Sequence, residues 1–289
     1  MTQLVVTRRQ ILAFRRRVGM LDMRRPTSAA SLRQAAWAGL QDSMPRAALL
    51  SLHARIEGVE PSTLEHSSLA QLWGPRFSTY VVPRRDFALF SVGRYPDDDK
   101  GRLRAERLAE RMRARLGSAR MTDRELGRAL GIGNEMRYAA TTGTIAIRWE
   151  GARAPAVWAV PRPRIEAAAA CRELARRYLH VFGPTTAESF ARWAGIGRGA
   201  GARAFDSLDL VPIRSPLGDE WLLPEDEPEL RGDETLDAAA RLLPSGDAYF
   251  LLDGAERELL VPRADRRARH WPRDASRRGR AGSSPRARR

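Results

Sequence analysis

The chain has 289 residues, and its hydrophobic content of 43% is enough to build folded cores. No stretch approaches the ~20 consecutive apolar residues that cross a bilayer, so we expect no membrane partner. The single cysteine, Cys171, excludes an internal disulfide and a cysteine-based zinc site. The four histidines lack metal-ligand spacing and the carboxylates are dispersed, so we expect no metal and no cofactor.

The net charge of +15 is carried almost wholly by arginine, since Lys100 is the only lysine among 50 basic residues. Residues 263–289 hold 11 arginines and two aspartates, a net of +9, so +6 of the total belongs to the other 262 residues. A moderately basic body is compatible with a polyanionic partner. Residues 1–19 carry arginine where a signal peptide needs an apolar block, so we expect a cytoplasmic protein.

Residues 1–98 are predicted to form the first of three units that combine helices with a short β-structure. Apolar residues recur at helical spacing, and a run rich in β-branched and aromatic residues predicts a strand. In chain order we expect helices over 7–22, 28–40 and 45–57, a strand over 77–83 and a helix over 84–91.

Residues 99–162 are predicted to form the second unit. It begins with an amphipathic helix over 101–117, whose arginine stripe is either a solvated face or a phosphate-tracking surface. Thr122 and Glu125 form a capping box that starts the next helix. A third helix and a hairpin over 144–160 complete the order of a winged helix.

Residues 163–224 repeat this order with different residues. We expect helices over 164–182, 185–194 and 201–208, followed by a hairpin over 210–223. The loop "GIGRGAG" at 195–201 follows a helix and lacks the Gly-Lys-Ser/Thr ending of a phosphate loop, so it is interpreted as a turn.

The C-terminal part changes in composition. Residues 225–262 are predicted to begin a β-rich element, and residues 263–289 to form an Arg-rich disordered tail. The tail resembles an out-of-frame reading of GC-rich DNA, which suggests that a C-terminal β domain is truncated or replaced. The predicted fold class is therefore α+β and mainly helical, with tandem winged-helix units followed by a partial β-rich C-terminal element.

The cluster Gln41-Asp42-Ser43 lies between two apolar runs and has two interpretations. Ser43 can cap the following helix, and Asp42 complements the helix dipole. The alternative is a site in which an amide, a carboxylate and a hydroxyl bind water or a ligand. Spacing alone does not decide between them.

Five segments together resemble one family, the winged-helix DNA-binding family that includes the AlkZ- and YcaQ-like DNA glycosylases. The segments are "GLQDSMPRAALLSLHARIEG", "WGPRFSTYVVPRRDFALF", "MRYAATTGTIAIRWEGARAPAVWAVP", "ARRYLHVFGPTTAESFARWAG" and "PSGDAYFLLDGAERELLVP". The resemblance spans residues 8–262. It implies three tandem winged helices and a β-rich C-terminal domain around a concave DNA cleft.

The resemblance also implies a site. The family's catalytic Gln-x-Gln or Gln-x-Asp element aligns with Gln41-Asp42-Ser43, so the implied catalytic residues are Gln41, Asp42 and Ser43. Gln41 matches the first position, and Ser43 replaces the second Gln or Asp. Tyr80 stands where the family has a histidine. By their neighbourhood, Arg76, Tyr80, Arg84 and Arg85 are expected to contact DNA.

The implied activity is monofunctional excision of alkylated bases from double-stranded DNA, including crosslinked DNA in some members. Water attacks the sugar C1′ through an oxocarbenium-like state. We expect the protein to act as a monomer. The alternative is a non-catalytic winged-helix DNA-binding or regulatory protein that has lost the glycosylase site.

Overall fold

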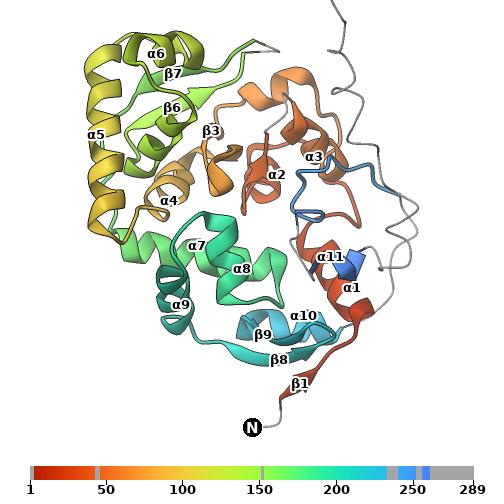
Figure 1. The fold of residues 1–289 in the computed structure, drawn as a ribbon. Helices are drawn as coiled ribbons and strands as arrows, with labels where there is room; N and C mark the ends of the chain where they lie inside the picture. The colour runs from red at the N-terminus through yellow and green to blue at the C-terminus, as the bar shows by residue number, and fades with distance from the viewer. Residues whose placement is uncertain (1–2, 43–45, 151–152, 233–239, 252–255, 261–289) are drawn as a thin grey trace, which may run out of the picture.

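The computed structural model describes residues 3–42, 46–150, 153–232, 240–251 and 256–260 (Figure 1). The predicted Arg-rich tail and Ser43 lie outside these residues. The α-helices are α1 (Arg8–Val18), α2 (Ala29–Ala35), α3 (Ala47–Arg55), α4 (Phe87–Val92), α5 (Asp99–Leu116), α6 (Asp123–Leu130), α7 (Ala167–Phe182), α8 (Ala187–Ala194), α9 (Arg198–Asp206), α10 (Glu227–Arg231) and α11 (Arg257–Leu260). The strands are β1 (Leu4–Val5), β2 (Leu40–Gln41), β3 (Leu69–Trp73), β4 (Thr79–Pro83), β5 (Met121–Thr122), β6 (Ile145–Arg148), β7 (Ala156–Ala159), β8 (Val211–Ser215) and β9 (Gly218–Leu222).

A six-stranded antiparallel sheet joins the first two predicted units in the order β2-β4-β3-β6-β7-β5. Its two halves meet where Gln71 of β3 pairs with Ile147 of β6. Gln71 Oε1 also accepts a hydrogen bond of 2.7 Å from the Trp149 amide. The two units therefore share one sheet. The sequence pattern did not predict this, because it indicates the strands of each hairpin but not which hairpins pair with each other.

The N-terminal segment packs against the third region of the chain. β1 pairs in parallel with β8, and β9 completes this second sheet in the order β1-β8-β9. Figure 1 shows these strands at the opposite end of the molecule from α5 and α6. A buried cluster joins α1, β8, β9 and α10, and it includes Ile11, Phe14, Ile213, Leu222 and Leu230.

The largest core surrounds α7, which packs against β3, β4 and α4 on one side and α8 and α9 on another. Its aromatic side chains contact one another, with ring centroids 4.7 to 6.3 Å apart; the set comprises Tyr178, Phe182, Phe190 and Trp193. Aromatic side chains bury large areas and prefer such tilted contacts. Tyr80 and Val82 of β4 belong to this core, whereas Leu40 of β2 packs with Val81 in a separate cluster that includes α2 and α3.

The second unit matches its predicted start but differs in its third helix. Thr122 and Glu125 form the expected capping box at the N-terminus of α6. The third helix is a 3₁₀-helix, η4, over Asn134–Thr142. The hydroxyls of Thr141 and Thr142 donate to carbonyls three residues back, a bonding pattern that competes with α-helical hydrogen bonds.

The prediction of a β-rich element over 225–262 is wrong for the residues that the structure describes there. These residues form η5 (Pro224–Asp226), α10, a series of turns over 240–251, and α11. Asp247 organises the turns, because its carbonyl accepts from the amides of Phe250 and Leu251 and its side chain accepts from the Tyr249 amide. Aspartate side chains favour such turns over strands.

No helix of the described residues is both long and apolar enough to span a membrane.

Candidate functional site

Gln41 lies in β2, a two-residue strand at the edge of the six-stranded sheet. Gly39 makes this strand possible, because its φ of +81° belongs to the left-handed region and a Cβ there would lie 2.9 Å from Tyr80 Cδ1. β2 then pairs with β4 so that Gln41 stands opposite Tyr80. Gln41 is partly exposed as a residue, although its amide oxygen is buried, and its neighbours Leu40 and Asp42 are buried throughout.

Asp42 follows β2, and its side chain is hydrogen-bonded to the first turn of α3. Its amide donates to the Thr79 carbonyl, so the extended pairing continues and successive side chains point to opposite faces. The fully buried carboxylate accepts a 3.0 Å hydrogen bond from the Ala48 amide in the first turn of α3. Burial raises the pKa of Asp42, and the amides of Ala48 and Ala47 act against this rise. Asp42 therefore supports the start of α3 and is separated from Gln41, whereas Ser43, the expected cap, lies outside the described residues and Arg46 is the N-cap residue.

The structure places Tyr80 in the interior. Its side chain is 1% exposed and packs against Phe90 and Trp193 of the core around α7. Burial raises the pKa of the Tyr80 hydroxyl far above its ordinary value. A side chain in this position does not reach the surface, which contradicts the expected contact between Tyr80 and DNA.

The three arginines expected to contact DNA are all exposed but are not gathered at one point. Arg76 precedes β4, whereas Arg84 and Arg85 follow it. The five residues of β4 span about 16 Å at ~3.3 Å per residue, so Arg76 lies well away from the other two. Arg84 Nε donates to the Ser67 carbonyl at 2.6 Å, and Arg85 lies 3.9 Å from Asp86.

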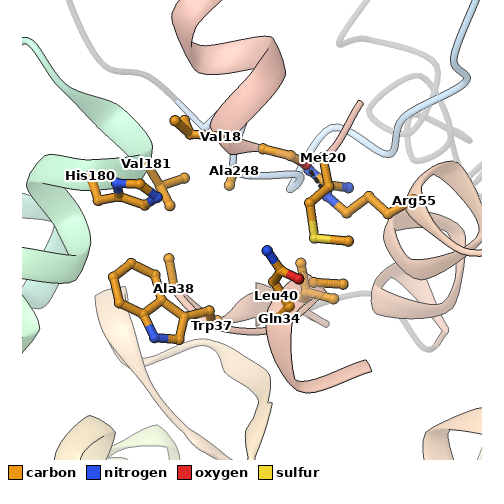
Figure 2. Close-up of a pocket in the computed structure, with 13 residues that line it drawn as sticks. Val18, Met20, Gln34, Trp37, Ala38, Leu40, Arg55, His180, Val181 and Ala248 are labelled. Atoms are coloured by element: carbon orange, nitrogen blue, oxygen red, sulfur yellow. Dashed lines mark hydrogen bonds between the residues drawn. The ribbon is translucent and has the colours of Figure 1, made fainter. Parts of the chain in front are cut away.

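A cavity of about 230 Å³ lies beside the β2 strand (Figure 2). Trp37 and His180 lie on one side of it, in edge-to-face contact with centroids 5.1 Å apart. Met20 and Arg55 lie on the other side. His180 Nδ1 is 2.8 Å from Asp226 Oδ1, which fixes the ring. The cavity is smaller than typical small-molecule pockets of ~300–1,000 Å³.

Sequence reasoning missed a C-terminal contribution to this region. Gly246 lies against the Gln41 side chain, Asp247 pairs with Arg55, and Ala248 lines the cavity. One signal was available, since Arg55 falls on the apolar stripe of its helix, three residues after Leu52. A lone arginine on a buried face requires a partner, although the sequence does not say which carboxylate supplies it.

No group of three or more His, Cys, Asp or Glu side chains among the described residues could hold a metal ion.

These features define an α+β protein in which helices and hairpins surround a site at the edge of a shared sheet. The model of the family described as DNA glycosylase AlkZ-like matches residues 34–285, so the chain belongs to the AlkZ-like DNA glycosylase family. Among solved structures, the fold is similar to the Streptomyces sahachiroi DNA glycosylase AlkZ, with a TM-score of 0.72 and 19% identity. The similarity covers 92% of this chain and 82% of that one. No curated protein sequence matches the chain.

Proposed function

We propose that this protein is a monofunctional DNA glycosylase that removes alkylated bases from double-stranded DNA, with Gln41 orienting the attacking water. The observation that carries the proposal is the placement of Gln41: a residue of intermediate exposure on a paired edge strand, with its amide oxygen turned inward, in a chain of the AlkZ-like family. Sites on strands hold a side chain more firmly than sites on loops. Asp42 belongs to the support of α3 and has no part in the proposed chemistry.

The chemistry asks little of the protein beyond positioning. Hydrolysis of a nucleosidic bond passes through an oxocarbenium-like sugar, as glycoside cleavage does. A purine alkylated at N3 or N7 is cationic and leaves without a strong general acid. A glutamine amide can accept a hydrogen bond from water through its oxygen and donate a hydrogen bond to water through its nitrogen. Gln41 can therefore hold a water near C1′, and holding reactants in place is itself a large catalytic contribution.

The strand pairing supports two winged-helix units as the DNA-binding framework. In the second unit, β5 lies between α5 and α6 and pairs with β7, which also pairs with β6. In the third, Thr185 lies between α7 and α8 and forms an isolated bridge with Trp221 of β9. A short strand that joins the terminal hairpin is the arrangement of a winged helix. Such units bind duplex DNA through their helices and hairpins.

The test is release of N7-methylguanine from a duplex that carries one such base. We expect free base and an abasic strand that breaks only after alkali treatment, because no lyase step is proposed. A duplex with an interstrand crosslink, run in parallel, tests whether bulkier adducts are substrates. Binding of these duplexes without any release would contradict the proposal and favour a non-catalytic DNA-binding protein.

A further inference from the structure

Arg55 and Asp247 form a buried ion pair beside the candidate site. Arg55 Nη1 lies 2.7 Å from Asp247 Oδ2 and Nη2 lies 2.9 Å from Oδ1, so the two side chains meet in the bidentate geometry. Their side chains are 3% and 0% exposed. Burial alone would raise the pKa of Asp247, but the Arg55 charge and its hydrogen bonds bring that pKa below its ordinary value.

The pair connects three distant parts of the chain. Arg55 Nε also donates to the Gly19 carbonyl after α1, and Nη1 donates to the Ser51 carbonyl within α3. Asp247 accepts from the Tyr249 amide within the C-terminal turns. Figure 2 shows Arg55 and Ala248 among the side chains that surround the cavity. A carboxylate satisfied in this way fixes the turn that carries it.

That turn touches Gln41. A Cβ at Gly246 would lie 3.4 Å from Gln41 Cδ, 3.5 Å from Cβ and 3.6 Å from Cγ, so residue 246 lies directly beside the glutamine side chain. Two residues after Gly246, Ala248 lines the cavity beside β2. Asp247 is therefore anchored between Gly246, which lies against Gln41, and Ala248, which lines the neighbouring cavity.

We propose that the Arg55–Asp247 pair is a positioning device that holds the turn over 246–248 against Gln41 and so fixes the direction of its amide. The effect on catalysis rests on the proposed function. The immobilisation of Gln41 rests on packing alone. Neither residue is assigned contact with the substrate. Their effect is exerted through Gly246, which separates them from Gln41.

The first experiment compares Asp247→Asn with the wild type in single-turnover release of N7-methylguanine. We expect at least a tenfold lower rate with DNA affinity unchanged within twofold, because Gln41 is displaced while the DNA-binding helices remain. Leu126→Ala is the control for lost stability, since it opens a cavity in the core of the second unit and lowers Tm. Both rates are measured at saturating DNA, so that a change in DNA binding by that unit does not enter the comparison. An Asp247→Asn rate equal to that of the control would overturn the proposal.

A second variant covers the case in which Asp247→Asn fails to fold. Gly246→Val keeps the ion pair but places branched methyl groups against Gln41, whereas Gly246→Ala adds a Cβ at ordinary contact distance. We expect the valine variant to lose far more release activity than the alanine variant at similar Tm. Equal rates for the two would overturn the proposal.

The immobilisation of Gln41 can also be measured by a method that does not depend on base release. Hydrogen exchange in Asp247→Asn should accelerate in peptides that contain Gln41 and residues 246–251, and stay unchanged there in Leu126→Ala. If the wild type releases no base but this acceleration occurs, the proposed function fails and the positioning device stands. Unchanged exchange around Gln41 would overturn the positioning device whatever the activity.

Discussion

At the scale of single residues, the neighbours Gln41 and Asp42 have different roles, because successive side chains of a strand point to opposite faces. Gln41 is partly exposed, while Asp42 is buried and bonded to the first turn of α3. The sequence pattern singles out the cluster Gln41-Asp42-Ser43 and is compatible with both a capping role and a binding site. The pattern does not decide between these interpretations, because the direction of the Asp42 side chain depends on the pairing of β2 with β4, two segments that are far apart in the chain. Tyr80 was misassigned for the same reason.

The capping interaction of Asp42 leads to a stability prediction. Asp42→Ala removes the acceptor for the Ala48 amide, so the free energy of unfolding should fall by roughly 0.5–2 kcal/mol, the range for loss of a side-chain acceptor at a helix N-terminus. Urea denaturation followed by circular dichroism measures it. The control is Asp99→Ala, which removes a carboxylate that is 97% exposed and should leave unfolding unchanged. Equal stability of the two variants would contradict the capping interpretation.

At the scale of elements, local patterns identified most helices, and long-range pairing decided the rest. The capping box of α6 and the amphipathic α5 follow from residues close in sequence. The arginine stripe of α5 is partly used within its own unit, since Arg104 stacks on Tyr138 at 4.0 Å and Arg111 donates to the Leu130 carbonyl. These contacts occupy two arginines of the stripe within the protein itself. Strand β3 went unpredicted, because its residues form a sheet only with partners from two other segments.

The junction of β9 with the C-terminal helix predicts a pH dependence of stability. Burial raises the pKa of Glu220 to about 7 from 4.5. Ser215 on β8 and Arg15 on α1 act against this rise, and Glu256, which precedes α11, adds to it. Because the folded pKa is above the unfolded one, this group contributes stability below pH 4.5 and loses it as pH rises toward 7.

The variant Glu220→Gln tests this effect. A shift of this size corresponds to about 3 kcal/mol at 1.36 kcal/mol per pKa unit. The wild type should lose about that much stability across the window relative to the variant, measured by denaturant unfolding at several pH values. Parallel pH profiles for the two proteins would contradict the assignment.

At the scale of the whole molecule, charge is distributed unevenly along the chain. Residues 263–289 carry a net of +9 out of +15, and the family match extends to residue 285. Composition reveals this asymmetry without any structure. The arrangement of the units could not be deduced in the same way, because the sheet shared by β3 and β6 and the return of β1 to β8 depend on contacts between distant segments.

The charge asymmetry predicts that the Arg-rich tail strengthens DNA binding without serving the chemistry. A chain ending at residue 262 should bind duplex DNA more weakly at low salt, with a salt slope reduced by about 0.9 for each phosphate that the tail neutralises. Its release rate at saturating DNA should equal that of the full chain. Fluorescence anisotropy over a series of salt concentrations measures the slope. An unchanged slope would show that the tail neutralises no phosphates.

The central claim, that Gln41 carries base excision, is tested most directly by single-turnover release of N7-methylguanine with Gln41→Ala. The account predicts a rate at least ~100-fold below wild type, the usual effect of removing a group that acts on the reacting water, with unchanged DNA affinity. The matched control is Gln3→Ala, which removes an exposed amide bonded to Asp219 and should retain full activity. Release by Gln41→Ala at the wild-type rate would contradict the account.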